Sequence, residues 1–243
     1  MNFEPHGGVV QLICSPIGNL GDITYRAVEC LKRADCIACE DTRHSRNLLN
    51  HYEICPRELI SLHDHNESHK GAQLAERILQ SGETLALISD AGSPSVSDPG
   101  FLLVRECISR NITVEVIPGP SSVITALVGS GLATDKFTFR GFLPVKSGKK
   151  EKILRVALES EETTIFFESP HRIKKTLAVI DELNPTRRIC VARELTKKFE
   201  TYHRGSAREL LLEFGDSTVK GEITLVLDGL SRSNRKDEKL GEQ

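Results

Sequence analysis

The sequence predicts an α/β fold with two α/β domains, a mostly parallel sheet in the N-terminal domain and a mixed sheet in the C-terminal domain. Short apolar runs alternate with segments of helical periodicity along the first half of the chain. Three of the runs end in loops of Gly, Pro and Ser, as expected where parallel strands finish at one sheet edge. A basic, Gly-containing stretch then precedes a second set of strands and helices.

Five strands are expected in the first domain, each a short apolar run between polar or turn-forming residues. The fourth has the unbroken apolar character of a strand that is covered on both faces. The expected strands are Gly8–Cys14, Cys36–Cys39, Leu59–Leu62, Thr84–Ile88 and Ile112–Ile117.

The helices expected between and after these strands are 24–34, 43–52, 67–80, 101–110 and 123–129. In the third of them, the spacing of Leu74, Ile78 and Leu79 predicts that these side chains point inward.

The second domain is expected at 144–230, after an N-terminal domain at 1–143, with the linker in the basic stretch 144–152. Ser169 and Pro170 predict a helix start, and Ser206 with Glu209 predicts a capping box. The polar residues 231–243 are expected to form a disordered tail. The expected strands are 163–168, 188–193, 199–204 and 221–227, and the expected helices are 152–158, 169–183 and 206–214.

The composition indicates a globular protein of the cytoplasm. Of the 243 residues, 39% are hydrophobic and 27% charged, and no apolar run approaches the ~20 residues that span a bilayer. The first eight residues do not resemble a signal peptide. The seven cysteines, an odd number, favour reduced and buried thiols. With a net charge of −2, any contact with nucleic acid requires a local basic face.

The pair Cys36 and Cys39 has the spacing of a redox or zinc motif, but it lies in an expected strand and has no second pair. Buried strand cysteines are therefore the favoured interpretation, and no metal site is expected.

The loops at the strand ends carry no phosphate-binding signature, because both the P-loop pattern and the dinucleotide-binding glycine pattern are absent. A nucleoside without phosphates, such as S-adenosylmethionine, is the better candidate ligand. The carboxylate of Asp90 suits ribose hydroxyls, and Ser121 and Ser122 suit an amino-acid group. The alternative for each loop taken alone is an ordinary tight turn.

Six motifs in this order resemble the tetrapyrrole methylase superfamily, and within it the branch that methylates small-subunit ribosomal RNA. The resemblance covers about Gly8 to Leu227. The motifs are Ser15–Asp22, Glu40–Arg43, Asp90–Gly100, Pro118–Ser122, Phe167–Arg172 and Ala192–Lys197.

The resemblance implies a homodimer that binds S-adenosylmethionine in the cleft between its domains. It implies 2′-O-methylation of a cytidine in the decoding region of small-subunit (16S) ribosomal RNA, with the RNA or the 30S subunit as partner. The cofactor contacts that it implies involve Pro16, Gly18, Leu20, Asp90, Ala91, Gly92, Ser93, Ser121, Ser122, Phe167, Glu168 and Ala192.

A ribose hydroxyl is a poor nucleophile, so a general base is expected to assist the reaction. The candidates at expected strand ends are Glu40, Asp41, Glu168 and His171, each with a structural role as the alternative. Three clusters of cations are candidate RNA contacts, with a solvated face as the alternative for each: Arg43, Arg46, Lys146, Lys149, Lys150, Arg193, Lys197 and Lys198. The turn Asp98–Gly100 is expected to shape its loop and the RNA entrance.

Two other functions fit the same pattern. One is a corrin or porphyrin precursor methyltransferase on the same fold, and the other is a non-catalytic module that binds RNA or a nucleotide. The motifs 40–43 and 167–172 favour the RNA methyltransferase by resemblance.

Overall fold

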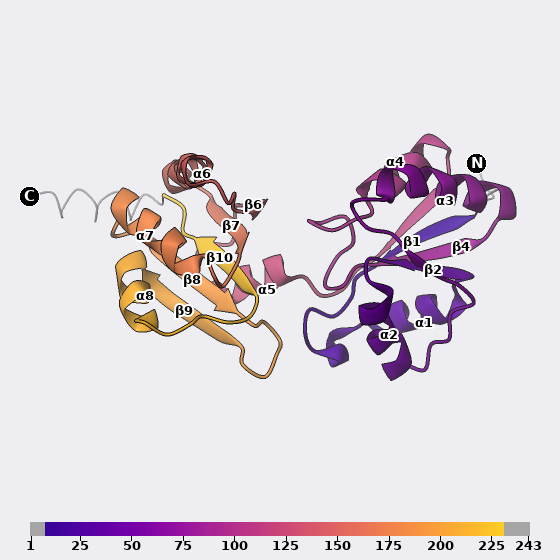
Figure 1. Cartoon of the computed structure of the whole chain (residues 1–243), viewed down its shortest axis with the longest axis horizontal. Coiled ribbons are helices and arrows are strands. Elements are labelled where there is room, and N and C mark those ends of the chain that lie inside the picture. The colour runs from indigo at the N-terminus through magenta and orange to yellow at the C-terminus, as the bar shows by residue number, and fades with distance from the viewer. Residues whose placement is uncertain (1–7, 231–243) are drawn as a thin grey trace, which may run out of the picture. The chain divides into compact units, whose positions relative to one another are not determined.

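The computed structural model describes residues 8–230, and the predicted tail at 231–243 lies outside the described residues (Figure 1). The chain divides into two compact units between Ser121 and Ser122, earlier than the predicted boundary after residue 143. The reason is strand pairing: residues 137–142 form a strand of the second sheet. The predicted linker 144–152 instead runs into a helix that begins at Ser147. Among the described residues, no helix is long and apolar enough to cross a membrane.

The sheet of the first unit is entirely parallel, which confirms the predicted fold class. Its strand order is β3-β2-β4-β1-β5, so the loops after β1, β2 and β4 leave neighbouring strands at one edge. The strands are β1 (Val9–Ile13), β2 (Cys36–Cys39), β3 (Leu59–Ser61), β4 (Thr84–Ile88) and β5 (Thr113–Ile117).

Helices cover both faces of this sheet (Figure 1). They are α1 (Tyr25–Arg33), α2 (Thr42–His51), α3 (Glu67–Ser81) and α4 (Phe101–Ser109), with a short 3₁₀ helix η1 (Leu20–Asp22) in the first loop. Successive strand residues alternate between the faces, so Cys36 packs in one core and Cys39 in the other. Two thiols on opposite faces of a sheet cannot bind the same metal ion or form a disulfide with each other. Leu79, predicted to face inward, is 39% exposed, whereas Leu74 and Ile78 are buried.

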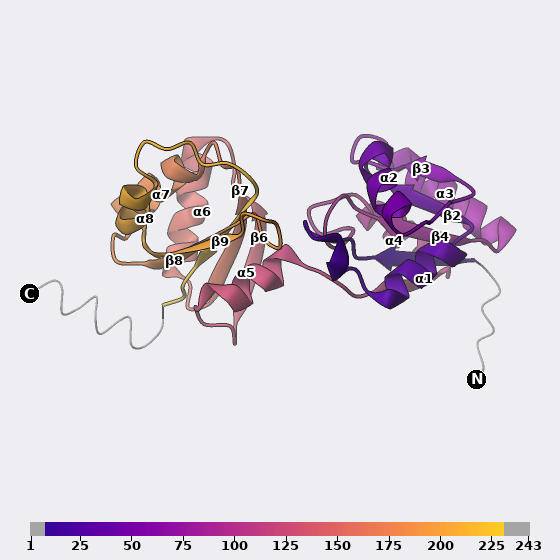
Figure 2. The ribbon, with the colours of Figure 1, turned by 90° about the horizontal axis from the view of Figure 1, so that it is seen from below.

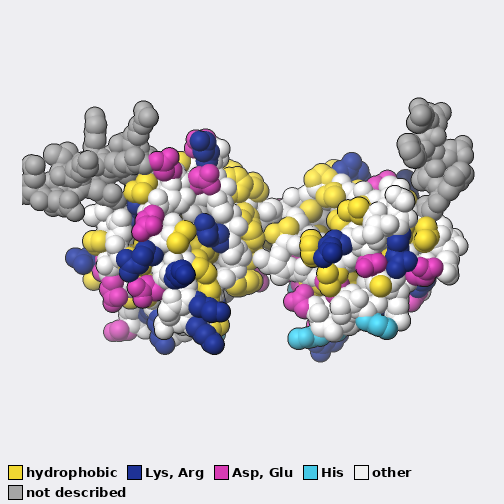
Figure 3. Space-filling model, turned by 90° about the horizontal axis from the view of Figure 1, so that it is seen from above, with side chains coloured by type: hydrophobic (Ala, Val, Ile, Leu, Met, Phe, Trp, Pro, Cys, Tyr) yellow, Lys and Arg dark blue, Asp and Glu magenta, His cyan; other side chains and the backbone are white. Residues whose placement is uncertain are grey.

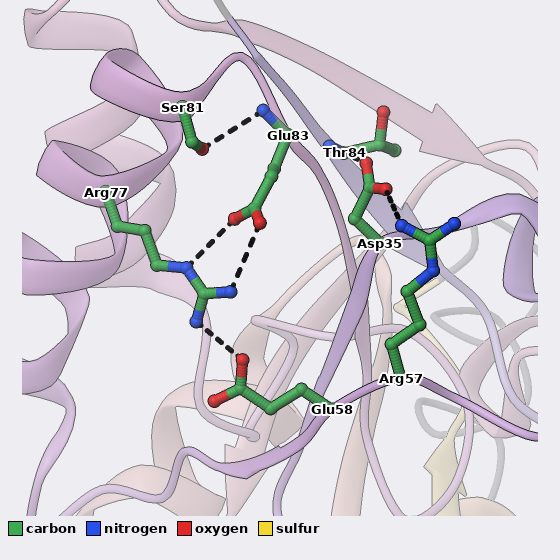
Figure 4. Close-up of polar contacts among 7 residues, drawn as sticks. All are labelled: Asp35, Arg57, Glu58, Arg77, Ser81, Glu83 and Thr84. Carbon is green, nitrogen blue, oxygen red and sulfur yellow. Dashed lines mark hydrogen bonds and ion pairs between the residues drawn. The ribbon is translucent and has the colours of Figure 1, made fainter.

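The amino edge of the first sheet is held by ion pairs (Figure 4). The Arg77 guanidinium donates to Glu83 Oε2 at 2.9 Å and to Glu58 Oε2 at 2.7 Å. Asp35 pairs with Arg57 and accepts a hydrogen bond from the Thr84 backbone N–H at 2.9 Å. These contacts join the starts of β2, β3 and β4 at the edge opposite the Gly/Pro loops.

The buried carboxylate of Glu67, at the start of α3, caps the N-terminus of α4. Its Oε1 accepts hydrogen bonds from the backbone N–H groups of Gly100 and Leu102 at 2.8 Å each, and of Leu103 at 3.3 Å. Gly100, the residue before the helix, has no side chain that could act as a cap. An anion at a helix N-terminus is further stabilised by the helix dipole.

We expect Glu67→Ala to lower the free energy of unfolding by about 2–4 kcal/mol, because buried N–H groups then lose a charged acceptor. Urea denaturation measures this difference. Glu29→Ala is the matched control, since Glu29 forms only an exposed ion pair with Arg33 and should change stability by less than about 0.5 kcal/mol. Equal stability of the two variants would contradict the capping role.

The second unit has a mixed sheet, as predicted, and its strand order is β6-β7-β10-β8-β9. β6 and β7 are parallel, whereas β10 lies antiparallel between β7 and β8. The strands are β6 (Phe137–Phe142), β7 (Thr163–Glu168), β8 (Arg188–Arg193), β9 (Thr201–Ser206) and β10 (Ile223–Leu227). The helices are α5 (Ser122–Ser130), α6 (Ser147–Glu159), α7 (Ile173–Leu183) and α8 (Ala207–Phe214).

The two helix starts predicted in this unit have different outcomes. The capping box is confirmed, because the Ser206 side chain accepts from the Glu209 N–H and the Glu209 carboxylate accepts from the Ser206 N–H. The predicted helix start at Ser169 is wrong, because the helix begins about one turn later. The Ser169 hydroxyl accepts from the His171 N–H in a turn, and α7 begins at Ile173.

The helices α6, α7 and α8 contribute to the apolar core on one face of this sheet, and α5 packs on β8, β9 and β10 from the other face (Figure 2). Two side chains of β9 fasten α5. The Tyr202 hydroxyl donates to the Thr125 carbonyl at 3.3 Å, and the Arg204 guanidinium donates to the carbonyls of Ser130 and Gly129 at the end of the helix.

Candidate functional site

The loops after β1 and β4 are joined directly at the carboxyl edge of the first sheet. Ser15 and Gly92 form a reciprocal backbone bridge, with N···O distances of 2.8 and 3.0 Å. Cys14 Sγ lies 3.2 Å from Ser93 Oγ. The loop after β5 packs on the same place, because a Cβ on Gly119 would lie 2.9 Å from the Cβ of Cys14. The three predicted loops therefore do converge, and close backbone approach explains the glycine at 119.

Asp90 follows β4 directly and is oriented by the neighbouring strand end. Its Oδ1 accepts a hydrogen bond from the Asp41 backbone N–H at 3.2 Å. The first loop is also fixed, because the Tyr52 hydroxyl of the segment after α2 donates to the Leu20 carbonyl at 2.5 Å. The Asp90 carboxylate is thus a partly exposed acceptor held by the backbone of the site.

Four carboxylates gather beside Asp41 at this edge: Glu40, Asp64, Asp90 and Asp98. Burial, together with the charges of Asp90 and Asp64, raises the pKa of Glu40. Burial raises the pKa of Asp98 to about 6, and the negative charge of Glu40 adds to the effect. Asp98 is absent from the catalytic candidates predicted from sequence. The fold of the loop places Asp98 beside the other carboxylates. The only sequence signal for this role is general: an Asp in a loop that follows a strand is a candidate functional residue.

The raised pKa of Asp98 predicts that the folding stability of the protein depends on pH. A carboxyl group with a raised folded-state pKa binds its proton more tightly in the folded state, so its contribution to stability falls as pH rises from the ordinary value of 3.8 to about 6. Asp98→Asn removes this penalty. We expect the variant to be more stable than the wild type by about 1–2 kcal/mol at pH 7, and by progressively less below pH 6. Denaturant unfolding at several pH values tests this, and a difference that does not change with pH would contradict it.

Asp41 is a weaker base than the sequence suggested. Its Oδ1 accepts from the Arg43 backbone N–H at 2.8 Å and its Oδ2 pairs with the Arg43 guanidinium at 3.0 Å. The hydrogen bonds from Arg43 lower the pKa of Asp41 to about 2. This pairing is the structural alternative considered for Asp41, and it also caps α2.

The loop from β4 to α4 is held in an unusual backbone conformation. Ser95 and Ser97 have φ values of 70° and 65°, in the left-handed region that residues with side chains seldom adopt. The loop ends at Gly100, where φ is 130° and an added Cβ would lie 2.7 Å from Ser95 Oγ. The Ser15–Gly92 bridge holds one end of this loop and Glu67 holds the other. Such over-determined loops are found at binding sites.

The first unit has features that fit a nucleoside cofactor such as S-adenosylmethionine. Ser15 Oγ is buried and has no hydrogen-bond partner within residues 8–230. Asp90 supplies an oriented acceptor. Of the predicted contacts in the loops, Pro16 and Gly92 are buried, Gly18 and Ala91 are exposed, and the partly exposed residues are Leu20, Asp90, Ser93, Ser121 and Ser122.

Glu168 has a structural role in the second unit. Its side chain is 0% exposed, its Oε1 pairs with the Arg172 guanidinium at 2.6 Å, and its Oε2 accepts from the Thr176 hydroxyl at 2.7 Å. Both oxygens are occupied, which argues against the predicted roles of this residue as base and as cofactor contact. Ala192 is likewise 0% exposed within β8 and offers no side-chain surface to a ligand. His171 is exposed, and Phe167 is partly exposed.

The cations predicted to contact RNA lie in different environments. Lys150 is a correction, because it is only 7% exposed and its Nζ donates to the Thr176 hydroxyl at 3.2 Å. Burial lowers the pKa of Lys150, while the Glu168 charge opposes that shift. Arg193 donates to Thr201 and to the carbonyls of Lys220 and Phe199.

Lys197 is partly buried and pairs with Glu194 and Glu222. The cations with mainly exposed side chains are Arg43, Arg46, Lys146, Lys149 and Lys198. The structure therefore leaves five of the predicted cations exposed, and of these Arg43 is paired with Asp41.

A family comparison identifies the fold and the class of reaction. The model of the family described as Tetrapyrrole (Corrin/Porphyrin) Methylases matches residues 9–211. The chain belongs to the tetrapyrrole methylase family. Two similar proteins, both called ribosomal RNA small subunit methyltransferase I, are 45% identical (Synechocystis sp.) and 48% identical (Haemophilus influenzae) to this chain. The alignments cover 94% and 95% of this chain and 81% and 82% of those proteins.

Solved structures of tetrapyrrole methylase fold support the same architecture. A uroporphyrin-III-C-methyltransferase from Thermus thermophilus aligns with a TM-score of 0.62 over 90% of this chain and 94% of that chain, at 18% identity. Diphthine synthase aligns with a TM-score of 0.66 over 91% of this chain and 90% of that chain, at 14% identity. At such low identity these similarities show the fold alone, whereas the curated relatives show that this tetrapyrrole methylase is a methyltransferase.

Proposed function

We propose that the protein uses S-adenosylmethionine to methylate the 2′-hydroxyl of a cytidine in the decoding region of small-subunit ribosomal RNA, and that it acts as a homodimer. The observation that carries the proposal is the convergence of three Gly/Pro loops, one of which presents an oriented carboxylate, Asp90. The names of the similar proteins supply the substrate class.

In this proposal Asp90 accepts hydrogen bonds from the ribose hydroxyls of the cofactor, and the buried Ser15 hydroxyl is available for a further polar group. The sulfonium of the bound cofactor supplies an already activated methyl group. The main task of the protein is therefore to position the attacking hydroxyl, which in well-oriented systems contributes as much as ~7–11 kcal/mol.

The remaining task is to accept the hydroxyl proton. Asp41 is a weak base and Glu168 is buried, so Glu40 becomes the strongest of the four candidates predicted from sequence. Its raised pKa brings it toward the operating pH, which favours a general base. Asp98 is a second candidate at the same edge for the same reason. His171 stays a candidate on the second unit.

Contact with RNA is expected to depend on exposed cations. We expect Lys149→Glu to weaken RNA binding several-fold and to reduce its salt dependence, while the affinity for S-adenosylmethionine stays unchanged. Fluorescence anisotropy measures the RNA affinity and calorimetry the cofactor affinity. Glu151→Lys on the same helix is the opposite control and should strengthen RNA binding or leave it unchanged. Equal RNA affinity of Lys149→Glu and wild type at low salt would contradict this role.

The decisive experiment is a methyl-transfer assay with labelled S-adenosylmethionine on three substrates: small ribosomal subunits, free small-subunit RNA and a tetrapyrrole precursor. Label on RNA alone supports the proposal, and label on the tetrapyrrole overturns it. An RNA substrate with a 2′-deoxycytidine at the methylated position should not react, because the 2′-hydroxyl is the proposed acceptor. No transfer to any substrate, with intact binding, would indicate a non-catalytic module.

A further inference from the structure

The two strands at one side of the second sheet, β6 and β7, carry four phenylalanines, which we call the aromatic platform: Phe137, Phe139, Phe142 and Phe167. β6 is the outermost strand of this sheet and pairs with β7. The Phe142 side chain is 60% exposed and Phe137 is 40% exposed. In the space-filling view, hydrophobic side chains are exposed on the surface of this unit among both Lys and Arg and Asp and Glu (Figure 3).

A β-bulge places the platform on one face of the sheet. Phe139 is paired with Ile165 and Phe142 with Phe167, so two residues of β6 stand opposite the single residue Phe166 of β7. In a regular strand, residues three positions apart face opposite sides. The extra residue restores Phe142 to the face of Phe139, and both rings contact the Phe167 ring, at centroid distances of 5.3 and 4.9 Å.

The bulge requires a left-handed backbone at Gly141, where φ is 65°. It turns a large ring toward solvent instead of burying it. The core on the other face contains Phe166 and Leu143, whereas α5 packs over β8, β9 and β10 rather than over the platform. Bulges at sheet edges commonly re-aim a side chain for binding, and clustered exposed rings indicate a binding surface.

The chain segment that carries three of the four platform residues is positively charged, although Asp135 precedes it and Glu162 accepts a hydrogen bond from Thr138 on β6 at 2.7 Å. Residues 136–149 contain four cations and no carboxylate. The four cations have exposed side chains: Lys136, Arg140, Lys146 and Lys149. Flat exposed rings interleaved with cations are the arrangement by which proteins bind single-stranded nucleic acid, with bases stacked on the rings and phosphates near the cations.

We propose that the aromatic platform binds unpaired bases of the RNA substrate by stacking on Phe142, with Arg140 beside the phosphate backbone. The proposal rests on the proposed function, because that function supplies RNA as the partner. A cofactor also contains a nucleobase, so the experiment has to separate RNA from cofactor. The charge of the neighbouring segment favours the polyanion, since S-adenosylmethionine has no phosphate.

The test compares Phe142→Leu with Phe142→Trp in the full-length protein. Leucine keeps the apolar volume but removes the aromatic face, whereas tryptophan keeps the face. The probe is a fluorescent single-stranded RNA oligonucleotide. We expect Phe142→Leu to bind it about tenfold more weakly and Phe142→Trp to bind about as well as wild type. Arg140→Gln should weaken binding and flatten its salt dependence. Leu212→Ala, at a 77% exposed position on α8, is the matched control and should bind normally.

Thermal unfolding and calorimetry with S-adenosylmethionine accompany each variant, to verify folding and cofactor affinity. RNA affinity unchanged in Phe142→Leu overturns the proposal. A loss confined to cofactor affinity also overturns it and assigns the ring to the cofactor, and a change confined to the association state assigns it to an interface between copies. If the wild type binds RNA through Phe142 but transfers no methyl group to it, the proposed function fails while the platform stands.

Discussion

Asp90→Ala is expected to abolish binding of S-adenosylmethionine, with a loss of affinity of at least about 100-fold. Asp90 lies in one of the three converged loops, two residues before the Ser15–Gly92 bridge, and its Oδ1 is held by the Asp41 N–H. Removing a charged acceptor from hydroxyl donors costs about 1.5–3 kcal/mol for each hydrogen bond, and a ribose offers two hydroxyls. Isothermal titration calorimetry measures the affinity directly, without requiring the RNA substrate.

Two control variants make this prediction sharper. Asp135→Ala removes an exposed carboxylate of the second unit and should leave the affinity unchanged. Asp90→Asn keeps the shape and one acceptor oxygen but removes the charge, so we expect an intermediate affinity. Unchanged calorimetric affinity of Asp90→Ala would remove this residue from the cofactor site and with it the main support for the proposed function.

Glu168→Ala is expected to lower the free energy of unfolding by about 3–5 kcal/mol, because it leaves buried cationic groups without their anion. The Arg172 guanidinium loses its partner at 2.6 Å, and Lys150, which already has a lowered pKa from burial, loses the nearby negative charge. Guanidinium chloride unfolding, followed by circular dichroism, measures the change.

The second unit provides a matched comparison for Glu168. Glu151 and Arg155 form an ion pair of the same spacing along the chain, but both side chains are about half exposed. Glu151→Ala should therefore change stability by less than about 0.5 kcal/mol. If Glu168→Ala were as stable as Glu151→Ala but inactive, the catalytic role predicted from sequence would be restored and the structural role would be wrong.

Much of the fold can be predicted from the sequence, because local residue patterns mark the strands and loops. β2, β4, β7 and β8 have the predicted ends, since each is an apolar run bounded by polar or Gly residues. The start of α7 and the orientation of Leu79 were not predictable in this way. A Ser-Pro pair initiates a turn as readily as a helix, so it does not fix the start of α7. The apolar residues of a helix show which face is buried but not how far the neighbouring element covers it, so the exposure of Leu79 is not predictable.

The candidate site also has features that were predictable from the sequence and features that were not. The loops that converge on Asp90 were predictable, because the carboxyl ends of neighbouring parallel strands meet at one sheet edge. The roles of individual charges were not. Lys150 and Glu168 have the residue types of an RNA contact and a base, yet burial makes them partners in one structural network. Asp98 was expected to shape its loop and the RNA entrance, yet it also lies among the carboxylates of the site.

The sequence by itself determined the class of fold, the family and the three loops, since these depend on short-range patterns and on motifs along the chain. Only the tertiary structure decided which charges are buried, which carboxylates share an edge and which rings share a face. The bulge between Phe139 and Phe142 is the clearest case: one extra residue reverses the side of the sheet on which a ring lies. Burial, pKa and facing direction depend on neighbours that are distant in the chain, so they are set by packing and not by local pattern.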